Sequence, residues 1–231
     1  MSNEARVREI THSLTDVRTR ITQAAAQAER RDDEITLIAV TKTYPVSDVE
    51  ILRDLGVRNF GENRSAEGAE KSAHVDGHWH FQGQIQSNKI AAISSWASTV
   101  HSLDDVSHVA KFDRAVSAIP GKRLQVFLQI SLDGAGHRAG IARDELSILA
   151  EAVLATEHLD LVGIMAVPPV EADADAAFAE IATIAASFKE KFPMAGYLSA
   201  GMSNDFEIAI AYGATHVRVG SQILGPRTYG A

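Results

Sequence analysis

The chain of 231 residues contains no cysteine, which excludes disulfide bonds, thiolate metal sites and cysteine nucleophiles. It also has no apolar stretch approaching the length of a membrane-spanning helix, so we expect no membrane partner. The first residues are polar and charged, and they lack the apolar core of a signal peptide. These absences together predict a cytoplasmic protein.

Positive charge is scarce as well. The chain has 22 lysines and arginines against 30 aspartates and glutamates, a formal net charge of −8. This surplus of negative charge argues against a nucleic-acid partner and favours a soluble monomer or small homo-oligomer. Hydrophobic residues make up 45% of the chain, which is enough for a substantial core. We find no repeat, low-complexity tract or linker, so residues 1–231 are expected to form one domain.

Two hydrophobic periodicities divide the chain. Residues 1–31 carry apolar side chains at alternating spacings of three and four, which predicts a helix that packs on the rest of the domain. Short β-branched runs then alternate with amphipathic stretches such as 46–55, 104–118, 143–156 and 174–191. The predicted strands are 35–40, 58–61, 79–82, 99–101, 124–131, 161–166, 196–198 and 217–219.

Eight strand–helix units in this order predict an α/β fold, a single TIM (β/α)8-type barrel with an extra N-terminal helix. A doubly wound sheet is the alternative, but it usually has fewer strands and often a glycine-rich first turn. Here the first turn holds Thr41, Lys42 and Thr43 instead.

Lys42 lies just after an apolar, β-branched segment that ends at Val40 and is expected to form a buried strand. Pro45 cannot continue a strand, so a loop begins near Lys42. In a barrel, this carboxyl end of a strand belongs to the catalytic face. A lysine that is partly desolvated there loses proton affinity and becomes an amine nucleophile. The alternative is that Lys42 extends from the strand end to solvent.

The last two predicted strands lead into loops with serine and glycine. Ser203 precedes the helical stretch 204–212, and Gly220 and Ser221 open the next helical turn. Barrels often bind phosphate in these two loops, through groups at a short helix N-terminus. The alternative is that both serines only cap helices.

Arg218 alternates with two valines in the last strand, so it can point into the barrel, where a permanent charge needs an acceptor. Glu62 or Asp205 would serve as an ion-pair partner, whereas a heterocycle nitrogen would serve as a ligand partner. A nucleophilic lysine, a late phosphate site and a polar residue directed at a ring together describe a site for pyridoxal 5′-phosphate (PLP).

Other candidates are weaker. His78 and His80 are two residues apart on one strand, but no third ligand accompanies them, so no metal site is predicted. His137 lies in a loosely spaced glycine loop that resembles an anion-binding loop. Glu62 and Asp205 are possible general bases, although surface or capping roles are commoner for isolated carboxylates.

Several segments resemble the family of pyridoxal phosphate homeostasis proteins, also called the YggS or proline synthase co-transcribed family, whose fold is similar to the N-terminal barrel of alanine racemase. The matching segments are Val40–Thr43, Phe60–Asn63, Trp79–Lys89, Leu198–Ser203 and Val217–Gly225. The chain departs from the family at Gln82, where a branched aliphatic residue is usual, and at Arg138, where many members carry lysine. Neither position is one that we assign to the cofactor.

The resemblance implies that Lys42 forms the internal aldimine with PLP. Ser203, Gly220 and Ser221 would hold the phosphate, Arg218 would approach the pyridine nitrogen, and Asn63 would line the ring. It further implies a protein of intracellular PLP (vitamin B6) homeostasis that binds the cofactor and delivers it to apo PLP-dependent enzymes. The alternatives are an amino-acid racemase or weak transaminase, and a scaffold that keeps PLP as a structural element. A racemase needs a second base opposite Lys42, and none of the four tyrosines is obviously placed for that role.

Overall fold

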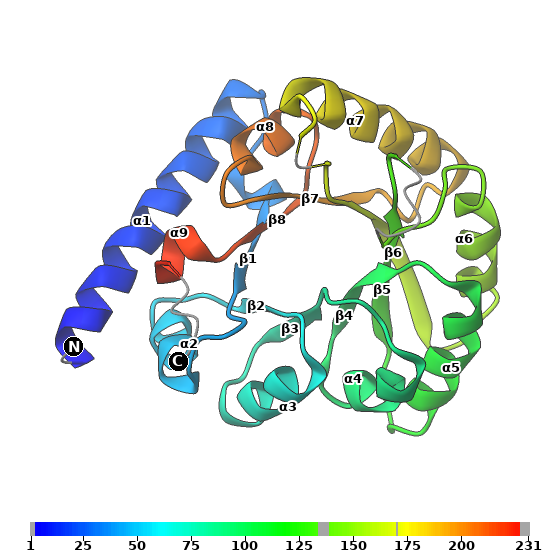
Figure 1. Ribbon diagram of the computed structural model, residues 1–231, viewed down its shortest axis with the longest axis horizontal. Coiled ribbons are helices and arrows are strands. Elements are labelled where there is room, and N and C mark those ends of the chain that lie inside the picture. Colours follow the sequence, from blue (N-terminus) through cyan, green and yellow to red (C-terminus); the bar gives the residue numbers. More distant parts are fainter. Residues whose placement is uncertain (1–2, 134–138, 170, 227–231) are drawn as a thin grey trace.

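Eight parallel strands close into a barrel, with β1 to β8 in sequence order around the ring, in the computed structural model of this chain (Figure 1). The structure describes residues 3–133, 139–169 and 171–226. Each strand pairs with the next along the chain, and β8 closes the ring on β1. This confirms the predicted TIM-type barrel. The strands are β1 Thr36–Val40, β2 Asn59–Glu62, β3 His78–Phe81, β4 Thr99–Leu103, β5 Leu124–Ile130, β6 Leu159–Ala166, β7 Tyr197–Met202 and β8 His216–Val219.

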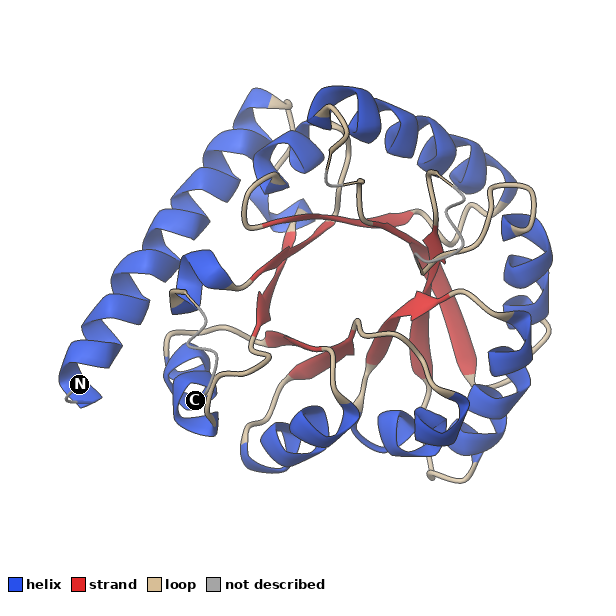
Figure 2. Ribbon diagram, viewed as in Figure 1, coloured by secondary structure: helices blue, strands red, loops and turns tan. Residues whose placement is uncertain are grey.

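Helices lie outside the ring of strands (Figure 2). They are α1 Asn3–Gln27, α2 Val46–Asp54, α3 Ser65–His74, α4 Ile90–Trp96, α5 Val106–Ser117, α6 Leu146–Leu154, α7 Ala174–Lys191, α8 Phe206–Ala211 and α9 Ser221–Leu224, with short 3-10 turns at Asp32–Glu34 and Ser87–Lys89. No helix in the described part of the chain is both long enough and apolar enough to cross a membrane.

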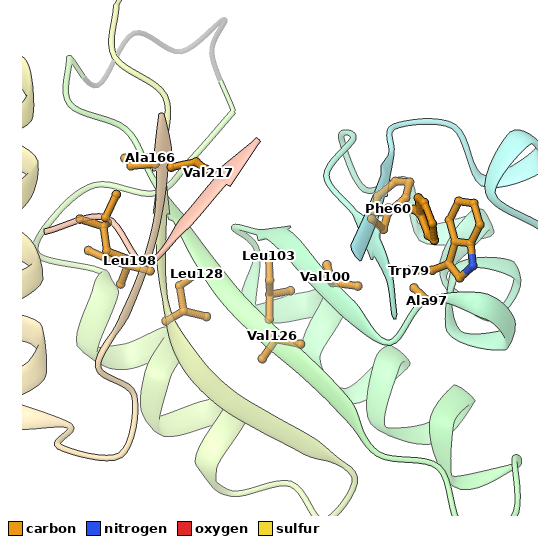
Figure 3. Packing of buried hydrophobic residues seen from close by; sticks show 14 of the residues in the cluster. Phe60, Trp79, Ala97, Val100, Leu103, Val126, Leu128, Ala166, Leu198 and Val217 are labelled. Atoms are coloured by element: carbon orange, nitrogen blue, oxygen red, sulfur yellow. The ribbon is translucent and has the colours of Figure 1, made fainter. Parts of the chain in front are cut away.

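The main hydrophobic core lies between the strands and the surrounding helices. Phe60 of β2 and Trp79 of β3 are opposite each other in the ladder, and their ring centroids are 5.1 Å apart (Figure 3). Leu198 of β7 and Val217 of β8 are buried in the same cluster. Because successive side chains of a strand point to opposite faces, the residues between these apolar ones are directed to the barrel interior.

Helix α1 lies along the outside of the barrel, beside α8, α9 and α2 (Figure 1). Arginines of α1, and Arg30 shortly after its end, bind neighbouring elements. Arg6 donates to Asp48 and to the Leu224 carbonyl, Arg20 to Glu207 and Gln222, and Arg30 to two carbonyl groups. The face of α1 that packs on the rest of the domain is buried at Ile10, Leu14, Val17, Ile21, Ala24 and Ala25. The helix ends at Gln27 rather than near residue 31, and Glu29 then has a left-handed backbone with φ 55°.

The interior of the barrel is unusually polar. His101 of β4 and Ser199 of β7 are joined by a hydrogen bond of 2.8 Å, although the two strands are not neighbours in the ring. That bond must therefore cross the interior. Barrels of this type usually fill the same space with branched apolar side chains. Ser199 also accepts from Arg218, so the polar interior extends along β8.

Candidate cofactor site

One cavity of about 730 Å³ opens where the strands end, and all six predicted cofactor residues line it. They come from the segments that follow β1, β2, β7 and β8, together with one residue within β8. The six are Lys42, Asn63, Ser203, Arg218, Gly220 and Ser221. The structure thus brings together residues that lie up to 179 positions apart (221 − 42), because the carboxyl ends of parallel strands share one face of the barrel.

Lys42 is half-buried in a short turn between β1 and α2. The next residue, Thr43, has φ 72°, a left-handed conformation that is rare for a β-branched residue. Two contacts hold the backbone on either side of Lys42. The Thr43 N–H donates to Glu67 Oε2 at 2.8 Å, and the Thr41 carbonyl accepts from Lys71 Nζ at 2.7 Å.

Glu62 is fully buried behind this turn. Its Oε1 accepts from Lys71 Nζ at 2.7 Å and from the Thr41 hydroxyl at 2.6 Å. Within the described residues, Oε2 has no hydrogen-bond partner. Burial raises the pKa of Glu62 above its usual value, although Lys71 and Thr41 oppose that shift. Glu62 is therefore the partner of Lys71, and the predicted alternative of a Glu62–Arg218 pair is wrong.

The loops after β7 and β8 meet through a hydrogen bond. The Gly220 N–H donates to the Ser203 hydroxyl at 3.3 Å. Ser203 does not cap a helix, because α8 begins at Phe206 and Asp205 occupies its N-cap position. The Asp205 carboxylate accepts from the Met202 N–H at 2.6 Å. Ser221 is exposed and is the first residue of α9. Neither serine is an N-cap, so the capping alternative is wrong for both.

Arg218 is 5% exposed and directs its guanidinium group into the barrel. It donates to the Ser199 hydroxyl at 2.7 Å and to the Ala166 carbonyl at 3.1 Å. Burial lowers its pKa to about 10, against the opposing attraction of Asp205. Among the described residues, no carboxylate lies within ion-pair distance of this guanidinium, and the two hydrogen bonds that it donates go to neutral oxygens.

A chain of hydrogen bonds continues from Arg218 through the interior. Ser199 is 2.8 Å from His101 Nδ1, His101 Nε2 is 2.9 Å from His80 Nδ1, and His80 Nε2 is 3.1 Å from Asn59 Oδ1. Burial is the main reason that the pKa of His80 is lowered to about 3, and it also lowers the pKa of His101 well below the ordinary value. Both rings are therefore neutral near pH 7.

Only one direction of donation satisfies the whole chain. The amide oxygen of Asn59 can only accept, so neutral His80 carries its proton on Nε2 and accepts at Nδ1 from His101 Nε2. His101 Nδ1 then accepts from the Ser199 hydroxyl, whose oxygen accepts in turn from the Arg218 guanidinium. The network assigns both tautomers, and it fixes Arg218 as the donor at the cavity end.

The sequence did not predict this hydrogen-bond chain or part of the cavity wall. Gln82, which the sequence marks only as a departure from the family pattern, lines the cavity. Its Nε2 is buried without a partner within the described residues. Gly83 lies so close to Asn63 that a Cβ would be 2.1 Å from its carbonyl oxygen, so only glycine fits there. The close approach of the two loops could not be read from spacing.

Two other sequence candidates have different outcomes. His80 gives both ring nitrogens to protein partners, whereas His78 is exposed at the opposite end of the barrel from the cavity. Among the described residues, no group of three histidine, aspartate or glutamate side chains is placed to hold a metal ion. His137 and Arg138 lie outside the described residues.

The chain is similar to several known proteins over most of its length. The family model of the alanine racemase N-terminal domain matches residues 13–228. The pyridoxal phosphate homeostasis protein of Mycobacterium bovis is 41% identical, over 95% of this chain and 93% of its own length. The structure of PipY from Synechococcus elongatus with PLP bound superposes with a TM-score of 0.81 at 29% identity, covering 94% of this chain and all of that one. A protein from Bifidobacterium adolescentis superposes with a TM-score of 0.87 at 28% identity, covering 96% of this chain and 97% of its own.

Proposed function

Since this chain belongs to the family of the alanine racemase N-terminal domain, and within it to the pyridoxal phosphate homeostasis proteins, we propose that it binds PLP and serves intracellular PLP homeostasis. The observation that carries the proposal is the single cavity in which an amine, two hydroxyl groups and a buried guanidinium converge. They belong to Lys42, Ser203, Ser221 and Arg218.

The residues present fit this cofactor. A cavity of about 730 Å³ is within the range of roughly 300–1,000 Å³ that is usual for small-molecule sites. PLP carries an aldehyde, a phosphate and a pyridine nitrogen, and the donor set offers a group suited to each. Gln82 Nε2, buried in the wall without a described partner, is a further donor that a polar ligand can satisfy.

We assign the covalent link to Lys42. When bound, PLP supplies an aldehyde that condenses with an amine, and one C=N bond replaces C=O with release of water. Lys42 must act as the neutral amine to form this bond. Its place at the edge of the cavity, half-buried after β1, supports that role. Asn63, on the neighbouring segment after β2, is assigned to the face of the ring.

The phosphate is assigned to the cup formed by Ser203, Gly220 and Ser221. The hydrogen bond between Gly220 and Ser203 keeps the two loops together, so the cup exists before a ligand enters. A hydroxyl group that donates to phosphate makes a charge-assisted hydrogen bond, which is stronger than a neutral one. The cup therefore distinguishes PLP from unphosphorylated pyridoxal.

Arg218 is assigned to the pyridine nitrogen. A permanently charged donor directed at this nitrogen disfavours its protonation, whereas a carboxylate would favour it. An unprotonated pyridine is a weak electron sink. Lys42, Arg218 and Asp205 are the titratable groups among the described residues lining the cavity, which include no tyrosine or histidine. The Asp205 carboxylate accepts from the Met202 N–H, so it serves the loop after β7 and we do not assign it as a second base. Both features support a carrier rather than a racemase or transaminase.

On this basis the protein holds PLP and delivers it to apo PLP-dependent enzymes. We propose the cytosol as its compartment, residues 1–231 as one PLP-binding domain, and a monomer or small homo-oligomer as its state. Transfer of the cofactor from purified, loaded protein to an apo-enzyme is the direct test. If the apo-enzyme gains activity no faster than the loaded protein releases PLP into solution, delivery by direct contact is refuted.

The covalent assignment has its own test. Borohydride reduction of the loaded protein should fix a pyridoxyl group on Lys42, and peptide mapping by mass spectrometry should locate it there. The Lys42→Ala variant should lose the adduct but keep non-covalent binding through the phosphate. An adduct on Lys71, Lys89 or Lys111 in the wild-type protein would refute the assignment.

The carrier role is tested by exchange of the α-proton in deuterated water, followed by NMR for several amino acids. We expect background exchange for all of them, because Arg218 keeps the ring a weak electron sink. Fast exchange by the wild-type protein would overturn the carrier proposal and favour a racemase or transaminase.

A further inference from the structure

The turn that carries Lys42 has an unfavourable backbone. Thr43 adopts φ 72°, and its branched side chain makes this conformation costly. A strained residue persists only where its surroundings hold it, and such residues gather at functional sites. The contacts around this turn, which we define as residues 41–43, must therefore hold Thr43 in its left-handed conformation.

Three charged side chains hold the turn from outside the cavity, and we refer to Glu62, Glu67 and Lys71 as the bracket. Lys71 is 3% exposed, and its ammonium group contacts the Thr41 carbonyl at 2.7 Å, Glu62 at 2.7 Å and Glu67 at 3.4 Å. A buried ammonium group is thus matched by three oxygen acceptors, which is what its three protons require.

Glu67 completes the bracket from the same helix. Its Oε2 accepts from the Thr43 N–H at 2.8 Å, while Oε1 accepts from Arg64 at 3.1 Å. The residues Glu67 and Lys71 are four apart on α3, so their side chains lie on one face of that helix. They contact the turn through the carbonyl before Lys42 and the N–H after it, and neither of them lines the cavity.

From this arrangement we infer that Glu67 and Lys71 are positioning residues, which hold the strained turn in the conformation that presents Lys42 to the cavity. The inference rests on the proposed function, because it concerns the formation of the covalent link at Lys42. It adds that the reactivity of Lys42 depends on α3, an element that forms no part of the cavity wall. The phosphate cup, by contrast, lies on the loops after β7 and β8 and does not depend on the bracket.

Because the bracket and the phosphate cup lie on different elements, their effects can be measured separately. In Glu67→Ala the Thr43 N–H loses its acceptor, the turn can relax, and Lys42 leaves its productive position. Misplacement of a reacting group by about 1 Å can cost on the order of a hundredfold in rate. We therefore expect the covalent link with PLP to form about ten- to a hundredfold more slowly. The rate is measured by absorbance after mixing and by borohydride trapping at timed intervals.

Binding without the covalent step provides the second readout. 4′-Deoxypyridoxine 5′-phosphate has the ring and phosphate of PLP but no aldehyde, so it cannot react with Lys42. Its affinity, measured by calorimetry, should change by less than about twofold in Glu67→Ala. The matched control is Glu70→Ala, which removes an exposed carboxylate from the same helix and should alter neither quantity.

A conservative variant separates positioning from general damage. In Glu67→Gln the amide oxygen can still accept from the Thr43 N–H, so most of the rate should return. If Glu67→Ala does not fold, the rate measured for Glu67→Gln still tests the inference. An unchanged rate in Glu67→Ala overturns the inference, and so does an equal loss of rate and analogue affinity. Absence of any adduct at Lys42 in the wild-type protein would instead refute the proposed function.

Discussion

Ser203 has two roles that a single hydroxyl group can fill at once. It accepts from the Gly220 N–H, which joins the loops after β7 and β8, and its own proton is available to a ligand in the cavity. Ser221, on the second loop, is exposed and retains its hydroxyl for the same ligand. The cup therefore depends on two side chains whose removal can be tested separately.

We predict that Ser203→Ala or Ser221→Ala weakens PLP binding roughly ten- to a hundredfold. Each change removes one charge-assisted hydrogen bond, worth on the order of 1.5–3 kcal/mol where water does not replace it. Titration by fluorescence or calorimetry measures the affinity. Unphosphorylated pyridoxal is the control ligand and should bind almost as before. Equal losses for PLP and pyridoxal would indicate a damaged fold rather than a damaged cup.

Thr43 leads to a prediction about stability. Asparagine tolerates the left-handed region better than threonine does, so Thr43→Asn should raise the free energy of unfolding of the apo-protein by about 1 kcal/mol. Urea denaturation measures the change. Thr43→Val keeps the β-branch and serves as the matched control, with no gain expected. A destabilised Thr43→Asn variant would show that the threonine hydroxyl, and not the backbone, determines the stability of the turn.

At the scale of secondary-structure elements, α1 contacts both helices beside the phosphate cup, α8 and α9. Arg20 donates to Glu207 of α8 at 2.6 Å and to Gln222 of α9 at 2.7 Å, and its guanidinium lies 4.7 Å from the centre of the Phe206 ring. Helix α8 follows the Ser203 loop, and α9 begins at Ser221. One side chain on the N-terminal helix thus contacts both elements that position the cup.

Arg20→Ala is therefore expected to lower the free energy of unfolding by about 1 kcal/mol and the affinity for PLP by about threefold. Thermal unfolding and ligand titration measure the two effects. Arg8→Ala removes an exposed arginine from the same helix and is the matched control. Loss of stability with no change in affinity would mean that α1 supports the barrel but not the cup.

The elements themselves were largely predictable from sequence, because period-2 and period-3.6 patterns depend on local burial. The limits of α7 agree with the prediction, whereas β7 extends to Met202 instead of ending at Leu198. The segment Ser199–Met202 has no β-branched residue, and its glycine, Gly201, has φ 92°, so composition favoured a loop. Parallel pairing with β6 and β8 outweighs that local preference.

The site was predictable where it depends on strand ends and unpredictable where it depends on contacts across the barrel. Lys42, Asn63, Ser203 and Gly220 each follow a strand, so topology alone brings them to one face. The contact between His101 and Ser199 joins strands that are not neighbours, and it depends on the diameter and stagger of the barrel. No spacing in a single sequence reveals those quantities.

At the scale of the whole molecule, the polar interior links the cofactor site to the stability of the fold. His80 and His101 are buried and neutral, and they form part of the hydrogen-bond chain that begins at Arg218. Either ring would lose an acceptor nitrogen if it became protonated, and the donation from the neighbouring group would be lost with it. The direction of the chain, and hence the orientation of Arg218, requires both rings to stay neutral.

This requirement predicts how stability depends on pH. The pKa values of His80 and His101 are lowered in the folded state, to about 3 for His80. Below about pH 6.5, and down to these lowered pKa values, the unfolded chain therefore binds more protons than the folded one. The stabilisation is therefore complete above about pH 6.5 and is lost as the pH falls. Each histidine contributes a slope of up to about 1.4 kcal/mol per pH unit. Glu62 acts in the opposite direction, because its raised pKa lets the folded form take up a proton first.

We expect the free energy of unfolding, measured with urea between pH 7.5 and 5, to fall most steeply below pH 6.5. Carboxylates with ordinary pKa values remain ionised over that interval, so the slope there reports His80 and His101 together with His216, whose pKa burial lowers to about 4. The double variant His80→Gln, His101→Gln should show a flatter profile, even if its stability at pH 7.5 is lower. If 1–231 is one domain, circular dichroism and tryptophan fluorescence should give the same midpoint at each pH. A wild-type slope near zero below pH 6.5 would mean that the rings accept protons in the folded state, and the single direction of the Arg218 chain would then be wrong.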